Sequence, residues 1–279
     1  MKFKDFLAEK LPRRLYNLLP SRAKLIGGVA LLRFPEELDE YEGKIGRLAL
    51  EFYKVGAVYR VYGVEGVERR PILKHLAGEE IEEIIHREYG CIFKLNLRRL
   101  MFCLGNSFER LRTAALVGRG EVVLDMFAGI GQFTIPIAVF SNPSRIYSIE
   151  INPEAYNYLQ ENVRLNGVEG IVEPIMGDCR RIVDERLRGT ADQVVMGYFW
   201  ETGEALPQAL HALKPSGGVI HFHDLARRGR EEEFIEKVLE KVREEGYLPR
   251  LLKWRKVKSY SKTRNHIVID FYAVREGSL

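Results

Sequence analysis

The segment from residue 121 to residue 150 constrains the fold of this chain more than any other. An apolar run at 122–124 ends at Asp125, which is the pattern of a buried parallel strand. Gly129 and Gly131 follow in the spacing D-x-F-x-G-x-G, where the backbone must turn tightly and let a ligand approach. Residues 132–140 predict a helix, and a second apolar strand at 145–149 ends at Glu150. The segment therefore predicts a βαβ unit with a ligand at the carboxyl ends of its strands.

The acid at the tip of the second strand indicates which ligand this is. Glu150 can accept hydrogen bonds from both hydroxyls of a ribose while the glycines hold the backbone back. A nicotinamide dinucleotide would want a third glycine where the chain has Thr134, and an acid before the first glycine suits a pyrophosphate poorly. S-adenosylmethionine has a ribose, an adenine and a cationic sulfonium but no phosphate, so it fits better. A structural strand–turn–helix without ligand is the alternative. The expected contacts are Asp125, Phe127, Gly129, Gly131 and Glu150.

Length and composition bound the remaining possibilities. A chain of 279 residues with 46% hydrophobic residues can form one large domain and a smaller one. No apolar stretch is long enough to span a membrane and no apolar signal segment opens the chain, so we expect a soluble, cytoplasmic protein. The three cysteines form no C-x-x-C pair, which argues against a disulfide framework, a zinc ribbon or an iron–sulfur cluster. We expect a monomer.

The chain divides into a small N-terminal α+β domain, residues 1–75, and a catalytic domain, residues 76–279. The first 24 residues carry seven basic side chains, which form either a solvated helix face or a contact with a nucleic-acid backbone. Residues 27–34, 48–51 and 55–64 are strand-like. Residues 76–117 form a connecting region, with strands expected at 81–86 and 92–97.

After Glu150 the pattern alternates regularly. Helices are predicted at 153–166, 203–213 and 231–245, and strands at 172–176, 191–196 and 219–223. Two long strands, 247–258 and 265–274, form an antiparallel pair at the end. This order predicts an α/β fold: a doubly wound sheet of the class I methyltransferase kind with a C-terminal antiparallel hairpin.

Further polar residues lie just beyond the strands. Asp178 could accept from the adenine amine or cap the following helix. His221 and His223 share one face of the fifth strand, and with Tyr198 they are candidates for lining the site. Two histidines could bind a metal, but no third ligand is evident, so we expect none. The sequence singles out no general base.

The stretch from residue 248 to residue 266 contains seven cations and no acid. Cations interleaved with aromatic rings suit a phosphate backbone and an unstacked base, so the hairpin is predicted to bind RNA; a merely solvated hairpin is the alternative. The expected RNA contacts are Lys253, Trp254, Arg255, Lys256, Lys258, Tyr260 and Arg264.

With these residues in place, the chain resembles the tRNA wybutosine-synthesis aminocarboxypropyltransferases, the archaeal and eukaryotic relatives of the tRNA N1-guanine methyltransferases. The resemblance runs from about residue 60 to the end and is specific at 100–110, 125–136, 149–166 and 196–198. It implies transfer of the 3-amino-3-carboxypropyl arm of S-adenosylmethionine to C7 of 4-demethylwyosine in phenylalanine tRNA, with release of 5′-methylthioadenosine. It also implies cofactor contacts at Cys103, Arg110, Glu150, Asp178 and Cys179, with Arg110 holding the cofactor's carboxylate.

The chain departs from the family pattern in places. Cys103-Leu104 stands where Ser-Pro is usual, and Cys179 stands where Asn is common. The methyltransferase relatives usually carry an Asn-Pro motif where this chain has Met196-Gly197-Tyr198. A tRNA N1-guanine methyltransferase on the same fold is the alternative function. An RNA-binding protein without cofactor is a third, but the intact Asp125, Glu150 and Asp178 argue against it.

Overall fold

The computed structural model describes residues 1–66, 70–199 and 202–277. These residues form two compact units, Met1–Leu104 and Gly105–Leu279, each described here by itself. Among the described residues, no helix combines the length and apolarity needed to cross a bilayer.

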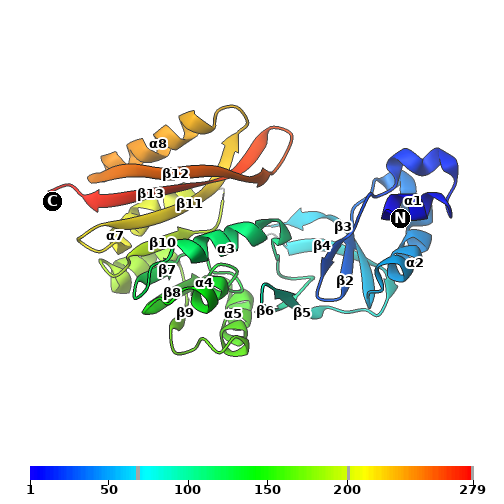
Figure 1. Cartoon of the computed structure of the whole chain (residues 1–279), viewed down its shortest axis with the longest axis horizontal. Helices are drawn as coiled ribbons and strands as arrows, with labels where there is room; N and C mark the ends of the chain where they lie inside the picture. The colour runs from blue at the N-terminus through cyan, green and yellow to red at the C-terminus, as the bar shows by residue number, and fades with distance from the viewer. Residues whose placement is uncertain (67–69, 200–201, 278–279) are drawn as a thin grey trace. The chain divides into compact units, whose positions relative to one another are not determined.

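The first unit is built on a four-stranded sheet in the order β1-β2-β3-β4 (Figure 1). β2 and β3 run parallel and the other neighbours antiparallel. Apolar side chains of the helices and strands, among them Leu7, Ile45 and Val58, form one buried core. A separate hairpin, β5 with β6, completes the unit, and residue 75, near which we expected a domain boundary, lies inside β4. The elements are α1 (Phe3–Ala8), β1 (Lys24–Ile26), β2 (Val29–Leu32), α2 (Glu42–Tyr53), β3 (Ala57–Glu65), β4 (Arg70–Gly78), β5 (Glu83–Glu88), β6 (Cys91–Asn96) and 3-10 turns at Arg13–Leu18 and Glu36–Tyr41.

Two details of this unit differ from the sequence prediction. The strand predicted at residues 48–51 is wrong, because these residues belong to α2. Ile45 and Ala49, four residues apart, are both fully buried, which is the spacing of a helix face rather than of a strand. The strand predicted at residues 27–34 is confirmed as β2 but is shorter, Val29–Leu32, because Gly27 and Gly28 adopt positive φ and turn the chain between β1 and β2.

The second unit contains a seven-stranded sheet in the order β12-β13-β11-β10-β7-β8-β9 (Figure 1). The five strands β7 to β11 run parallel to one another. β13 pairs antiparallel with β11, and β12 pairs antiparallel with β13 at the edge of the sheet. The chain enters at β7, moves outward to β9, and returns to β10 on the other side of β7. The predicted doubly wound sheet is confirmed, and its order reverses between β7 and β10, where ligands of such sheets bind. The strands are β7 (Val122–Asp125), β8 (Arg145–Glu150), β9 (Val172–Met176), β10 (Gln193–Met196), β11 (Gly218–Arg227), β12 (Tyr247–Ser259) and β13 (Arg264–Arg275).

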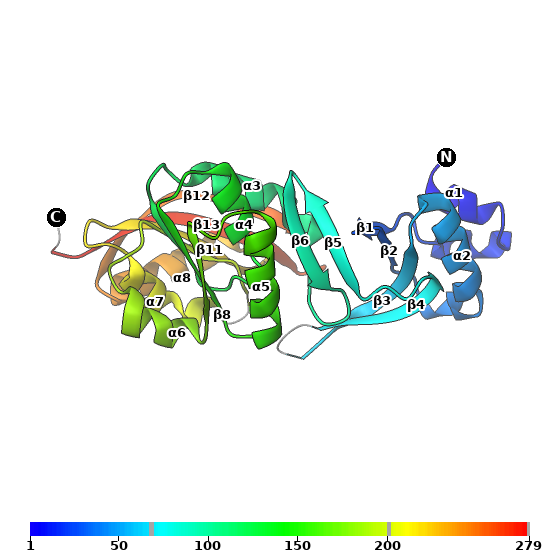
Figure 2. The same cartoon turned by 90° about the horizontal axis from the view of Figure 1, so that it is seen from below.

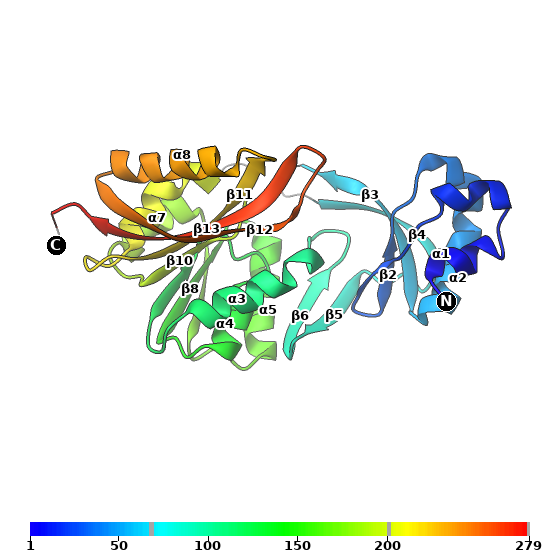
Figure 3. The same cartoon turned by 45° about the horizontal axis from the view of Figure 1, so that its top comes forward.

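Helices cover both faces of this sheet (Figures 2 and 3). The main core lies between the sheet and the face carrying α6, α7 and α8, whose buried residues include Ile182, Leu210 and Val238. β11 runs four residues beyond its predicted end at His223, because β13 pairs with it along its whole length. The helices are α3 (Ser107–Leu116), α4 (Thr134–Phe140) and α5 (Pro153–Leu165) on one face and α6 (Cys179–Ile182), α7 (Leu206–Ala212) and α8 (Glu231–Glu244) on the other. 3-10 turns lie at Leu104–Asn106 and Thr202–Glu204, and a π-helical segment lies at Val183–Leu187.

Candidate active site at the carboxyl ends of the parallel strands

The glycine loop after β7 is held in one conformation by its own backbone. Gly129 and Gly131 have φ of +56° and +93°, a region that residues with a Cβ rarely adopt. A Cβ on Gly131 would also lie 3.0 Å from the side chains of Ile135 and Leu159. The Gly131 N–H donates to the carbonyl of Ala128 at 2.8 Å, which closes the turn. The loop is therefore preformed at the point where the strand order reverses.

Glu150, the last residue of β8, ties this loop to the neighbouring strand. Its Oε2 accepts from the Gly129 N–H at 2.7 Å, and its Oε1 accepts from the Asn152 N–H at 2.7 Å. The side chain of Asn152 in turn caps α5, which begins at Pro153. Glu150 is thus fixed beside the glycine loop, in the place predicted for a ribose acceptor.

Asp125, the last residue of β7, is completely buried under the same loop. Its Oδ2 accepts from the Thr134 hydroxyl at 2.8 Å, and Thr134 also contacts the Ser148 hydroxyl at 2.8 Å. Burial raises the pKa of Asp125 to about 6, and the negative charge of Glu150 adds to this rise. A carboxyl group held in this way gains most from a nearby positive charge, which a sulfonium would supply.

Asp178 and Cys179 follow β9. Asp178 accepts from the Arg180 N–H at 2.9 Å as the N-cap of α6 and pairs with the Arg180 guanidinium at 2.7 Å. The Arg180 side chain lowers the pKa of this carboxyl. The helix cap weighed as an alternative is therefore present, and a contact with adenine stays a prediction. Burial raises the pKa of Cys179 to about 12, so its thiol stays protonated.

The two remaining predicted cofactor contacts lie in different units. Arg110 is on α3 and is 1% exposed. Cys103 belongs to the first unit, so its contact stays a prediction. Aromatic rings line the loop after β10: Phe127 stacks with Tyr198 at 5.5 Å, and Phe199 meets Tyr260 of the hairpin edge-on at 5.7 Å.

His221, one of the candidates for lining the site, is part of a buried network instead. Its Nδ1 lies 2.7 Å from Asp270 Oδ1, and its Nε2 lies 2.8 Å from Gln193 Oε1. The Gln193 amide is oriented by its nitrogen, which donates to the Leu116 carbonyl at 3.0 Å and to Glu121 Oε2 at 2.5 Å. Both ring nitrogens of His221 thus have partners, one on Asp270 and one on Gln193. His221 therefore has no nitrogen left for a ligand.

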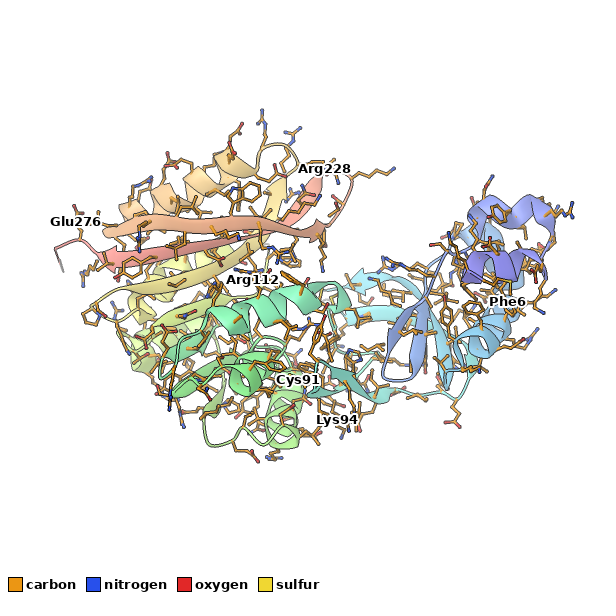
Figure 4. The ribbon with its side chains drawn as sticks, viewed as in Figure 1. Phe6, Cys91, Lys94, Arg112, Arg228 and Glu276 are labelled. Atoms are coloured by element: carbon orange, nitrogen blue, oxygen red, sulfur yellow. The ribbon has the colours of Figure 1, made fainter. Side chains whose placement is uncertain are left out.

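The same network continues to α3. Arg112 extends from α3 toward the sheet (Figure 4) and pairs with Asp270 at 2.6 Å and with Glu109 at 2.6 Å. Burial by itself would raise the pKa of Asp270, but hydrogen bonds and charge from His221 and Arg112 outweigh it and lower this pKa to about 2. Sequence reasoning missed this network, because Asp270 lies 158 residues from Arg112 and Arg255 lies 146 residues from Glu109 in the chain.

The basic hairpin is partly occupied by contacts within the second unit. Arg255 pairs with the buried Glu109 at 2.6 Å, and Lys258 donates to Asn106 Oδ1 at 2.8 Å. Lys253 and Lys256 are exposed on β12. Of the other predicted RNA contacts, Trp254 is half-buried and packs on the core, while Tyr260 and Arg264 are exposed. Within the described part of the chain, no group of His, Cys, Asp and Glu is arranged to hold a metal.

Comparison with known proteins places these features in a family. Residues 84–249 match the TRM5/TYW2 methyltransferase domain, and residues 3–81 match the TYW2 N-terminal domain. A tRNA(Phe) (4-demethylwyosine(37)-C(7)) aminocarboxypropyltransferase of Methanocaldococcus jannaschii is 42% identical over 74% of this chain and 81% of its own. The tRNA (guanine(37)-N(1))-methyltransferase Trm5b of Pyrococcus abyssi is 36% identical over 94% of this chain and 77% of its own. The crystal structure of Pyrococcus horikoshii TYW2 in complex with MeSAdo matches with a TM-score of 0.83 at 33% identity, covering 98% of both chains.

Proposed function

The chain belongs to the TRM5/TYW2 methyltransferase family, and we propose that it is a tRNA 4-demethylwyosine aminocarboxypropyltransferase. It transfers the 3-amino-3-carboxypropyl group of S-adenosylmethionine to C7 of 4-demethylwyosine in phenylalanine tRNA and releases 5′-methylthioadenosine. The observation that carries this choice within the family is the match of residues 3–81 to the TYW2 N-terminal domain, which joins the match of the catalytic domain.

The residues at the carboxyl ends of β7 and β8 fit S-adenosylmethionine. Glu150 takes the ribose hydroxyls, because its carboxylate is held beside the glycine loop by the Gly129 and Asn152 N–H groups. Asp125 favours the positive sulfonium from below the glycines, and Phe127 borders the loop. Asp178, with the Cys179 backbone, holds the adenine, and Arg110 holds the methionine end by pairing with its carboxylate.

The bound sulfonium supplies three activated carbons, and the protein selects one by presenting it to the nucleophile. This chain has Met196-Gly197-Tyr198 where methyltransferase relatives have an Asn-Pro motif. Gly197 lets the ring of Phe133 pack directly on the backbone, since a Cβ there would lie 2.8 Å from that ring. The segment after β10 is thus built without the amide side chain that methyltransferases place there, which supports a different presentation of the cofactor.

The partner is tRNA, and the protein acts as a cytoplasmic monomer. The exposed Lys253 and Lys256 of β12, with Arg264 and the ring of Tyr260, form the part of the hairpin best placed to meet RNA. Arg255 and Lys258, which pair with Glu109 and Asn106, shape this surface and add positive charge to it. Trp254 supports it from the core side.

The test uses tRNA bearing 4-demethylwyosine and S-adenosylmethionine labelled in either the methyl group or the carboxypropyl arm. We expect only the arm label to enter tRNA. Entry of the methyl label alone would contradict the proposal and favour methyl transfer, the second candidate, which the similarity to Trm5b supports. A parallel reaction with tRNA carrying unmodified guanine at the same position tests that second candidate directly.

A further inference from the structure

His223 and His266 form a buried imidazole pair that the functions above do not use. His223 is on β11 and His266 on β13, and each is 1% exposed. His223 Nδ1 lies 3.1 Å from His266 Nε2. Among the described residues, neither His223 Nε2 nor His266 Nδ1 has a hydrogen-bond partner, although both atoms are buried. Buried polar atoms in native proteins are nearly always paired, so a ligand or a water must complete these two.

The pair lies between two segments that border the proposed site. The His223 ring is 5.2 Å from the ring of Phe133, which directly follows the glycine loop and packs on Gly197. The His266 ring is 5.0 Å from the ring of Phe199, which follows β10 and also contacts Tyr260. The cofactor loop and the segment after β10 therefore meet at this pair.

The hydrogen bond between His223 Nδ1 and His266 Nε2 contains one hydrogen. This determines which of the two outer nitrogens, His223 Nε2 and His266 Nδ1, carries hydrogen and which is a bare acceptor. When both rings are neutral, one outer nitrogen is a bare acceptor and the other carries hydrogen. A proton taken up at the bare nitrogen can move through the central hydrogen bond, and a different proton then leaves from the other end. The pair can therefore pass a proton on without any side-chain movement.

The surroundings keep the pair neutral between such events. Burial lowers the pKa of His223 to about 3 and that of His266 to about 2. At His223, His221, Arg112 and Lys258 lower the pKa further and Asp270 acts against them. At His266, His223 and Lys258 lower the pKa further and Glu109 acts against them. The pair thus has an open acceptor nitrogen over the whole physiological pH range and releases a proton readily.

We propose that the His223–His266 pair is the proton relay of the transfer reaction, a proposal that rests on the function above. A new carbon–carbon bond forms at C7 of the acceptor base as the carbon–sulfur bond breaks and leaves its electron pair on sulfur. C7 then still carries its hydrogen, and the base is positively charged. That hydrogen leaves as a proton to the bare outer nitrogen of the pair, its bonding electrons restore the aromatic ring, and the opposite outer nitrogen releases a proton toward water.

Two substitutions remove the relay while keeping the central contact. The amide of glutamine can replace Nε2 of a histidine and that of asparagine can replace Nδ1, so His266→Gln and His223→Asn can each keep a hydrogen bond between the two positions. Neither amide can take up a proton near neutral pH. The matched control is His211→Gln, which changes a histidine of α7 that pairs with Asp184 at 3.0 Å.

We expect both variants to bind S-adenosylmethionine and tRNA as the wild type does, while the single-turnover rate falls by about 10²-fold or more, the usual contribution of a general base. With tRNA carrying deuterium at the attacked carbon, the variants should show a kinetic isotope effect that the wild type lacks, because proton removal becomes limiting. Nitrogen NMR of the free wild-type protein should show both rings neutral with a hydrogen between them. His211→Gln should behave as wild type.

A rate loss without an isotope effect would mean that the pair only positions its neighbours, and unchanged rates or a charged pair by NMR would also overturn the relay. If either variant binds the ligands poorly, the isotope effect in the other decides. A failure of the proposed function can be told apart from a failure of the relay, because the function is tested by which label the wild type transfers to tRNA. The relay is tested by the isotope effect and by NMR of the histidine rings.

Discussion

Protonation of Asp125 should make S-adenosylmethionine affinity depend on pH. Burial raises the pKa of this carboxyl to about 6 in the free protein. At pH 5 about one molecule in ten then carries the carboxylate, and at pH 7 about nine in ten do. A bound sulfonium favours the carboxylate and lowers its pKa, so binding releases a proton below pH 7. If the bound pKa falls well below 5, affinity should rise about tenfold from pH 5 to pH 7, or about 1.4 kcal/mol, and then level off.

Isothermal calorimetry across this pH range measures the effect. 5′-Methylthioadenosine provides the matched control, because it has the same adenine and ribose but no sulfonium, and its affinity should stay nearly flat. Asp125→Asn keeps the shape and the contact with Thr134 but cannot titrate, so it should abolish the pH dependence. His223 and His266 do not interfere, since their pKa values lie below the window. If the affinities of both ligands depended equally on pH, or if neither depended on pH, the placement of Asp125 near the sulfonium would be refuted.

Further substitutions test the other assignments. Glu150→Ala removes an acceptor from the ribose and from the Gly129 N–H, each bond being worth about 1.5–3 kcal/mol, so calorimetry should show at least a tenfold loss of affinity; unchanged affinity would contradict its role. Arg110→Ala should weaken S-adenosylmethionine more than 5′-methylthioadenosine in the same titrations, and equal weakening would mean that this buried side chain is structural. Lys256→Ala, and likewise Lys253→Ala, should flatten the log–log salt dependence of tRNA binding in filter assays by about one, while wild-type slopes would move the RNA surface elsewhere. Asp270→Asn leaves Arg112 and His221 without their carboxylate partner and should lower the free energy of unfolding in urea by about 3–5 kcal/mol; a loss below about 1 kcal/mol would argue against the buried network.

The fold of the second unit and the positions of its acids were predictable because they follow from local patterns. An apolar run of four to six residues that ends in a carboxylate places that carboxylate at the end of a parallel strand. Asp125 and Glu150 accordingly end β7 and β8, and Asp178 lies two residues beyond β9. The short strand predicted at residues 48–51 failed for the complementary reason: four residues are too few to separate a period of 2 from a period of 3.6.

Partners distant in the chain could not be predicted. The absence of acids between residues 248 and 266 suggested that every cation of the hairpin was available to RNA. Glu109 and Asn106, however, are 146 and 152 residues away from Arg255 and Lys258 in sequence and contact them directly. A count of charges along the chain cannot detect such pairing, because it depends on how α3 packs beside β12. The hairpin therefore divides into cations held by α3 and cations that face solvent.

His221 and His223 show the same limit within a single strand. Two residues apart on β11, they point to one side of the sheet, and the sequence offered no reason to treat them differently. His221 lies between the carboxylate of Asp270 and the oxygen of Gln193, so both of its ring nitrogens already have partners. His223 meets another imidazole and an aromatic ring, so it stays neutral and keeps one nitrogen open. A ring whose nitrogens both have partners offers no site for a further proton, and a ring with an open nitrogen does, so only the second histidine is suited to proton transfer. The packing of β13 against β11 determines which of the two it is.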